Sequence, residues 1–107
     1  MNEIENFKKL INEREFYAAH EALEELWFPI RKSKSEYCLS LKGFINAAVS
    51  LELYKRKKIE QSKKIYLIYK KYVSEERISQ TENYSEFMQL KLFIDMKFSE
   101  INMKIIN

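Results

Sequence analysis

Apolar residues recur every three to four positions along most of this chain, with polar and charged residues between them. This spacing matches the 3.6-residue turn of an α-helix and not the two-residue alternation of a β-strand. The chain has one glycine and one proline, so it lacks the residues that many tight turns between strands require. We therefore predict an all-α protein, a bundle of about five helices that ends in a long C-terminal helix. The predicted helices span residues 3–12, 15–29, 35–57, 59–73 and 84–106.

The second predicted helix has one apolar face that contains the chain's only histidine and only tryptophan. At about 100° per residue, one stripe holds Phe16, Ala19, His20, Leu23, Leu26, Trp27 and Ile30. Pro29 has no amide hydrogen and disfavours helical backbone at Phe28, so the helix should end there or continue only as a kinked turn. The polar segment RKSKS follows as a loop, and we expect its last residue, Ser35, to cap the third helix.

The third predicted helix carries small residues beside its apolar stripe. Gly43 and Ala47 form a strip on the flank of the stripe. Glycine inside a helix costs about 1 kcal/mol relative to alanine, so Gly43 needs a packing reason. We expect another helix to approach closely at this strip.

The last predicted helix is apolar on two sides. One stripe holds Phe87, Leu90, Ile94, Phe98, Ile101 and Ile105, and the nearly opposite stripe holds Met88, Leu92, Met96 and Met103. A helix on the outside of a monomer should not expose a second apolar face. Either this helix runs through the middle of the bundle, or its second face meets another subunit. Because a chain of this size holds few helices to surround it, we predict a homodimer.

Composition and length bound the remaining possibilities. A chain of 107 residues makes a single helical domain, 1–107, that buries about two thirds of the surface its unfolded form exposes. No apolar run approaches the roughly 18 residues of a membrane helix, and the N-terminus is too polar for a signal peptide, so we expect a cytoplasmic protein without membrane contact. The single cysteine, Cys38, has no partner for a disulfide and should be a core thiol.

Charge is distributed unevenly along the chain. Residues 1–28 carry seven Glu against three Lys or Arg, a net −4, whereas residues 55–72 carry eight Lys or Arg against one Glu, a net +7. The basic positions are Lys55, Arg56, Lys57, Lys58, Lys63, Lys64, Lys70 and Lys71. Nucleic-acid-binding proteins of this size usually have a higher net charge than the +3 found here, so we do not expect nucleic acid as a partner. A solvated helix face explains the basic run, and an acidic protein partner would fit it.

One group of side chains has the spacing of a metal site. His20 and Glu24 are four residues apart, so both side chains point to the same side of one helix. A third ligand would come from another helix, and Glu52 is the candidate because it projects into the apolar stripe of the third helix. A His-Glu-Glu set suits a divalent metal such as zinc.

The alternative is that His20 packs in the core as a neutral side chain. A buried imidazole also needs a polar partner, so Glu24, Glu52 or a backbone carbonyl would satisfy its ring nitrogens. We favour this structural interpretation because the chain shows no second cluster of candidate ligands or bases. Trp27 is then a core anchor whose indole N–H should have a nearby acceptor.

The segment from Phe7 to Ile65 resembles the domain-of-unknown-function 309 family of small all-helical bacterial and archaeal proteins. The family signature, Ala-His-Glu-x-x-Glu-x-x-Trp after a short helix and an aromatic residue, is matched by Ala19–Trp27. A second family block, Leu-Gln-Gly-Leu-Ile-Gln before small apolar residues, is matched by Leu41–Ala48. Two positions depart from the pattern: Lys42 replaces a frequent glutamine, and Leu53 stands where a second histidine is frequent.

Two functions remain open from the sequence. The first is a helical module of uncharacterised role, not an enzyme and without a cofactor, that self-associates or binds a partner. The second follows from the resemblance, because the family is similar to proteins labelled predicted metal-dependent hydrolases. In that case His20, Glu24 and Glu52 would bind the metal, and Glu21 would be the candidate base. Glu21 falls on the outer face of its helix and Leu53 replaces an imidazole, so both observations count against the hydrolase.

Overall fold

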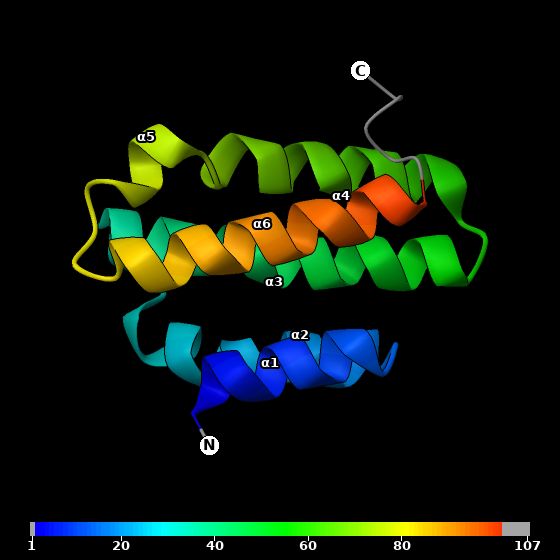
Figure 1. The fold of residues 1–107 in the computed structure, drawn as a ribbon, viewed down its shortest axis with the longest axis horizontal. Helices are drawn as coiled ribbons and strands as arrows, with labels where there is room; N and C mark the ends of the chain where they lie inside the picture. The colour runs from blue at the N-terminus through cyan, green and yellow to red at the C-terminus, as the bar shows by residue number, and fades with distance from the viewer. Residues whose placement is uncertain (1, 102–107) are drawn as a thin grey trace.

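Helices make up the whole regular structure of residues 2–101, which are the residues that the computed structural model describes (Figure 1). The elements are α1 (Glu3–Asn12), α2 (Phe16–Trp27), the 3-10 turn η1 (Phe28–Ile30), α3 (Glu36–Lys55), α4 (Ile59–Tyr72), α5 (Glu75–Ile78) and α6 (Tyr84–Glu100). Helices α1 and α2 pack side by side beneath the α3–α4 pair, and α6 crosses in front of that pair (Figure 1). The all-α class and the five long helices are confirmed. The short helix α5 was not predicted, and the predicted extension of the last helix to 106 lies outside the described residues.

Side-chain caps explain where two of the helices begin. The Asn2 Oδ1 atom accepts a hydrogen bond of 2.8 Å from the Glu5 amide at the start of α1. The predicted Ser35 cap is confirmed, because its Oγ atom accepts a hydrogen bond of 3.2 Å from the Cys38 amide at the start of α3. Pro29 lies in the first turn of η1, so α2 ends as the predicted kinked turn.

Helices α1 and α3 both end in a left-handed residue that is not glycine. Arg14 has a φ of 61° after α1, and Lys57 has a φ of 65° after α3. In both turns the next amide, of Glu15 or Lys58, bonds back to a carbonyl five residues earlier at 2.9 Å. Glycine is the usual residue at this position because side chains with a Cβ atom are strained there. Neither turn contains a glycine, so neither was predicted from the sequence.

Helix α3 lies at the centre of the bundle and touches α4 along its small-residue strip. A Cβ atom built on Gly43 would lie 2.5 Å from the Val73 Cγ2 atom and 3.1 Å from the Tyr72 Cβ atom. Ala47, one turn later, is fully buried. The predicted close approach of another helix at Gly43 is therefore confirmed, and that helix is the end of α4.

Two serines join α3 to α4 inside the core. The Ser50 hydroxyl donates to the Ser62 carbonyl at 2.8 Å, and the Ser62 hydroxyl donates to the Ser50 carbonyl at 2.7 Å. Both side chains are fully buried. Each buried hydroxyl thus has a hydrogen-bond acceptor on the backbone of the facing helix. The two bonds fix how α3 and α4 are aligned along their lengths.

Helix α6 closes the core with one face only. Phe87, Leu90, Ile94 and Phe98 are buried. Their aromatic rings pack against α3 and α4, with Phe87 5.6 Å from Phe44 and Phe98 4.7 Å from Tyr66 between ring centroids. The opposite face is exposed at Leu92 and Met96, so α6 does not run through the middle of the bundle. Met88, also predicted on this outer face, is instead partly buried against the core, and Met103 lies outside the described residues.

Tyr69 links α4 to α6 through a partly buried hydrogen bond. Its hydroxyl donates to the Asp95 Oδ1 atom at 2.7 Å. Burial of the ring, and then the negative charge of Asp95, raise the pKa of Tyr69 above its ordinary value of 10.0. The unfolded chain loses this proton near pH 10, whereas the folded chain keeps it, so the folded state binds more protons above that pH.

We therefore expect this interaction to contribute fully to the free energy of unfolding below pH 10, and the free energy of unfolding to fall as the pH rises above that value. Replacing Tyr69 with phenylalanine should cost about 1 kcal/mol at pH 8 and make the alkaline decline shallower. Urea unfolding from pH 8 to pH 11 measures both effects. The same replacement at the exposed Tyr84 serves as the control and should keep the wild-type decline. An equally steep decline in the Tyr69 variant would contradict the assignment.

Candidate functional site

His20 lies on α2 where this helix faces the second half of α3, and most of its side chain is covered. The side chain is 20% exposed, and its Nε2 atom lies 3.2 Å from the Glu24 Oε2 atom, one turn further along. The Nδ1 atom is buried and has no hydrogen-bond partner among the described residues. The ring of Tyr17, one turn earlier, lies 5.6 Å from the imidazole between centroids. The imidazole thus contacts two other side chains of α2, Tyr17 one turn earlier and Glu24 one turn later.

A cavity of about 300 Å³ opens between α2 and the end of α3. Its lining consists of Phe16, Tyr17, His20, Val49, Glu52, Leu53 and Arg56. Ligand pockets usually measure about 300 Å³ or more, so this cavity suits only a small molecule. Most of the lining is apolar. The polar part is the ion pair in which the Arg56 Nε atom donates to the Glu52 Oε2 atom at 2.6 Å.

The predicted metal ligands come together only in part. His20 faces Glu24 and shares the cavity with Glu52, as predicted. Glu52, however, pairs with Arg56, and Glu24 does not line the cavity. Within residues 2–101, no group of three or more His, Cys, Asp and Glu side chains is placed to hold one metal ion. Zinc binding at these residues therefore stays a prediction.

The other candidate residues of the motif have structural positions. Glu21 is exposed on α2 and does not line the cavity, so nothing holds it near His20 as a base. Trp27 packs against the core, as predicted, but its buried indole N–H has no acceptor among the described residues. That part of the prediction is wrong. Cys38 is a buried core thiol, and its Sγ atom lies 3.2 Å from the Ile30 carbonyl oxygen.

Sequence reasoning missed Tyr17 and Arg56 at the cavity. Tyr17 falls outside the apolar stripe in the helical projection, and it is 59% exposed in the structure although it lines the cavity. Arg56 was counted in the basic run. The four-residue spacing of Glu52 and Arg56 is the signal that would have paired them.

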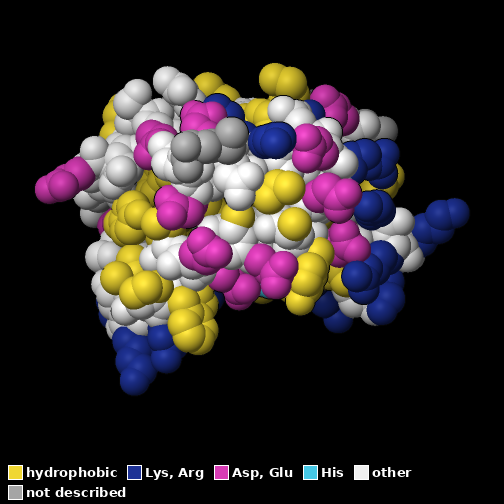
Figure 2. Space-filling view, turned by 90° about the horizontal axis from the view of Figure 1, so that it is seen from below, with side chains coloured by type: hydrophobic (Ala, Val, Ile, Leu, Met, Phe, Trp, Pro, Cys, Tyr) yellow, Lys and Arg dark blue, Asp and Glu magenta, His cyan; other side chains and the backbone are white. Residues whose placement is uncertain are grey.

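Charged side chains divide the surface as the sequence predicted. Figure 2 shows Lys and Arg side chains gathered at the end of the molecule where α3 meets α4 and a second group at the opposite end, with Asp and Glu side chains between them over the face of α1 and α2. The residues Lys55, Arg56, Lys57 and Lys58 form that basic end and are all exposed. Among the described helices, none is long and apolar enough to cross a membrane.

A known protein family matches the first part of the chain. Residues 4–65 match the family described as Domain of unknown function (DUF309), which is more than half of the 107 residues. The chain belongs to this family. The DUF309 match covers α1, α2, α3 and the first half of α4, so it includes His20, Glu24 and Glu52 but leaves out α6. No curated protein and no solved structure matches the chain.

Proposed function

We propose that this DUF309 protein is a non-catalytic helical module that self-associates through the outer face of α6. The observation that carries the proposal is the exposure of two large apolar side chains on that face, 60% for Leu92 and 59% for Met96. At 100° per residue they lie nearly opposite Ile94, which is fully buried in the core. They therefore contribute nothing to the core of the single chain.

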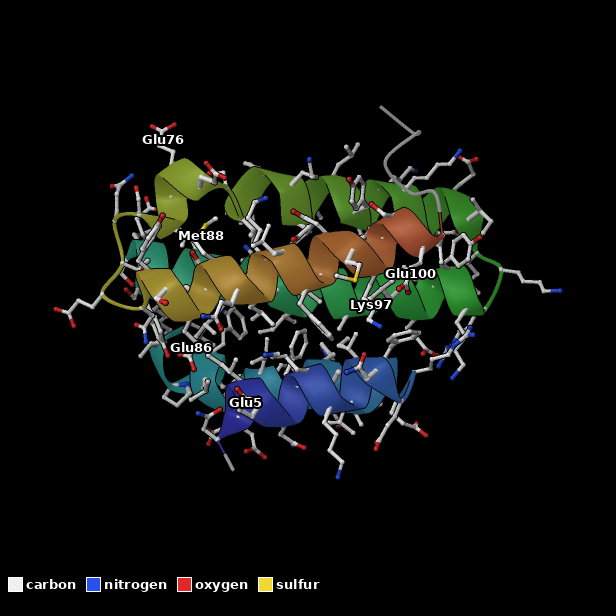
Figure 3. The ribbon with its side chains drawn as sticks, viewed as in Figure 1. Glu5, Glu76, Glu86, Met88, Lys97 and Glu100 are labelled. Carbon is white, nitrogen blue, oxygen red and sulfur yellow. The ribbon has the colours of Figure 1, made fainter. Side chains whose placement is uncertain are left out.

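The outer face of α6 carries one exposed charge, Glu100, which lies at its end one turn after Met96. The same ridge holds Ser85 and Gln89 before Leu92, and Ser99 after Met96. Of the charged residues labelled in Figure 3, Glu86 and Lys97 lie on the flank of the helix by their spacing, whereas Glu100 lies at the end of the ridge. In a chain that is 33% charged, a ridge with a single charge at its end is a surface that two copies can bring together with little repulsion.

A second copy of the chain is the partner that this ridge fits. In a two-fold symmetric dimer the same patch meets itself, so a patch with little charge brings few charges of the same sign together. The chain has a net charge of +3, and contacts through its basic end would bring like charges together. One helix face buries a small area, so we expect a dissociation constant on the order of micromolar or weaker.

Sedimentation equilibrium of the full chain tests self-association. We expect a mass that rises with concentration toward twice the chain mass of 13.0 kDa. A mass of one chain at every concentration up to about 1 mM would contradict the proposal, because an association weaker than that would leave the protein a monomer.

The hydrolase is a second candidate, favoured by the contact between His20 and Glu24 beside a cavity that also contains Glu52. If it were correct, the purified protein would hold one metal ion per chain and lose it when His20 is replaced with alanine. We expect no stoichiometric metal, and a loss of about 1–2 kcal/mol of stability in that variant because a largely covered side chain is removed. Elemental analysis and thermal unfolding measure the two results. The matched replacement of Glu21, which is exposed, should change neither.

Three predictions about partners and location remain open. The basic end of the molecule would suit an acidic protein partner, and binding of nucleic acid is not expected there. The cytoplasmic location also stays a prediction. A pull-down with the full chain, compared with a chain in which Lys57 and Lys58 are replaced with glutamate, addresses the acidic partner.

A further inference from the structure

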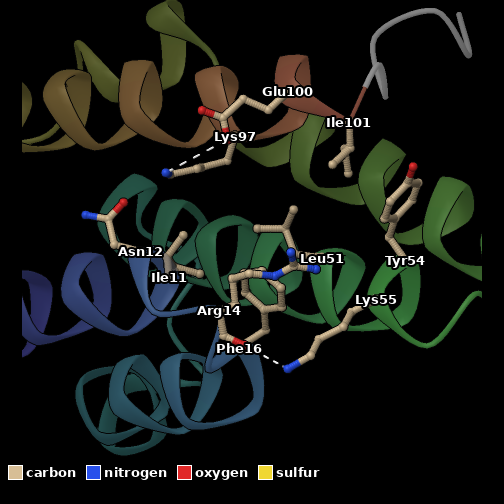
Figure 4. Close-up of a pocket in the computed structure, with 10 residues that line it drawn as sticks. All are labelled: Ile11, Asn12, Arg14, Phe16, Leu51, Tyr54, Lys55, Lys97, Glu100 and Ile101. Atoms are coloured by element: carbon tan, nitrogen blue, oxygen red, sulfur yellow. Dashed lines mark hydrogen bonds and ion pairs between the residues drawn. The ribbon is translucent and has the colours of Figure 1, made fainter.

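A second cavity lies away from His20, where the ends of three elements meet. It measures about 230 Å³ and is bounded by the end of α1, the turn into α2, the end of α3 and the end of α6 (Figure 4). Its apolar lining comes from Ile11, Phe16, Leu51, Tyr54 and Ile101. An apolar floor of this kind can receive the hydrocarbon part of a small molecule.

Three positive side chains, one negative side chain and the amide of Asn12 complete the lining. Lys97 and Glu100 from α6 lie 3.9 Å apart and compensate each other (Figure 4). Arg14 and Lys55 also line the cavity, and neither forms an ion pair with a carboxylate among residues 2–101. The Lys55 ammonium donates a hydrogen bond of 3.0 Å to the Arg14 carbonyl, so the two residues are held together. The cavity thus has an uncompensated positive side.

Arg14 and Lys57 share one backbone conformation, and only Arg14 lines the cavity. Arg14 takes the left-handed conformation, with a φ of 61°, at a helix end where glycine is favoured. Lys57 has the same conformation at the end of α3 but does not line the cavity. The two positions therefore form a matched pair that differs in access to the cavity.

We propose that this cavity binds a small carboxylate that carries an apolar body. The Arg14 guanidinium can bind a carboxylate through two hydrogen bonds, and the Lys55 ammonium adds a second positive charge. The apolar body would lie on the floor beside Phe16 and Leu51. Because the cavity is smaller than most ligand pockets, the molecule has the size of a single ring or a short branched chain. This assignment is independent of self-association through α6.

Titration of the isotope-labelled full chain with benzoate, phenylacetate and hexanoate, followed by amide NMR shifts, tests the proposal. We expect saturable shifts at the residues around this cavity for at least one of the three carboxylates. The neutral amide of the same compound should bind at least about tenfold more weakly, because it lacks the charge that Arg14 and Lys55 recognise. Inorganic phosphate, which has the charge without the apolar body, should also bind more weakly.

Arg14→Gly and Lys57→Gly separate the charge from the fold. Both replacements remove a cation and relieve a left-handed backbone, so both variants should fold. We expect Arg14→Gly to weaken carboxylate binding about tenfold or more and Lys57→Gly to leave it unchanged. Absence of saturable shifts with all three carboxylates would overturn the proposal. Equal binding of acid and amide, equal binding of phosphate, or unchanged binding in Arg14→Gly would each overturn it as well.

Discussion

A leucine in place of Gly43 is expected to destabilise the fold by about 3 kcal/mol or more, which is a large part of the stability of a domain of this size. The reason is the contact between α3 and α4. Even the first carbon of a side chain would lie 2.5 Å from the Val73 Cγ2 atom, and the Tyr72 Cβ atom blocks the neighbouring space at 3.1 Å. Neither atom is at the end of a flexible side chain, so the helices themselves must separate. Thermal or urea unfolding measures the loss.

Gly43→Ala gives a finer version of the same test. Alanine favours helix over glycine by about 1 kcal/mol, so a variant limited by helix propensity would gain stability. We expect a net loss of about 1–2 kcal/mol, because the contact with Val73 outweighs that gain. In a Val73→Ala background, the loss caused by Gly43→Ala should become smaller, since the obstructing methyl group is gone. A Gly43→Ala variant that is more stable than the wild type would refute the packing role of this glycine.

Glutamate at both Leu92 and Met96 is expected to abolish self-association. Each copy would lose two apolar side chains from the interface, and four carboxylates would face one another across the symmetry axis. Burial of these side chains contributes roughly 1 kcal/mol or more apiece, and like charges brought together cost several kcal/mol, so the affinity should fall by about a hundredfold or more. The variant should sediment as a single chain at every concentration. Its monomer fold should persist, because both positions are exposed in the single chain.

Leu67 provides the matched control for that variant. Its side chain is 51% exposed on α4, close to the exposure of Leu92, and it lies outside the proposed interface. The same change to glutamate at Leu67 should therefore leave the mass of the assembly unchanged. Dimers that persist in the double variant, or that disappear in the Leu67 variant, would place the interface elsewhere.

The fold could be predicted from the sequence where the signal is local. Helical periodicity indicated the five long helices, Pro29 marked the end of α2, and Ser35 marked the start of α3. Gly43 also revealed a tertiary contact, because a glycine inside a helix is unfavourable unless a neighbouring element packs closely against it. The helix α5 was missed because it is a single turn, Glu75–Ile78, too short to show periodicity.

Other features depend on contacts between distant residues and had no local signal. The spacing places Ser62 in the apolar stripe of the fourth predicted helix, but nothing in the sequence pairs it with Ser50, to which it is bonded in the core. The left-handed turns at Arg14 and Lys57 carry none of the glycine that usually marks them. Only the packed structure reveals these positions.

Contacts between candidate residues on the same helix could be predicted from the sequence, whereas contacts between residues on different helices could not. The four-residue spacing of His20 and Glu24 places them on one side of α2, and the structure confirms their contact. Whether Glu52 reaches the same point depends on how α2 and α3 pack and on what else Glu52 can bind. Arg56, one turn away on its own helix, forms that pair instead. The spacing of residues along one helix cannot rank such competing partners.

An isotope-filtered NMR experiment on a mixture of labelled and unlabelled full chain tests the self-association face most directly. Such an experiment detects only contacts between different copies of the chain. If the outer face of α6 is the interface, methyl groups of Leu92 and Met96 should show contacts to protons of the other copy. The absence of intermolecular contacts at both residues, or contacts confined to other surfaces such as that around Leu67, would contradict the proposed function.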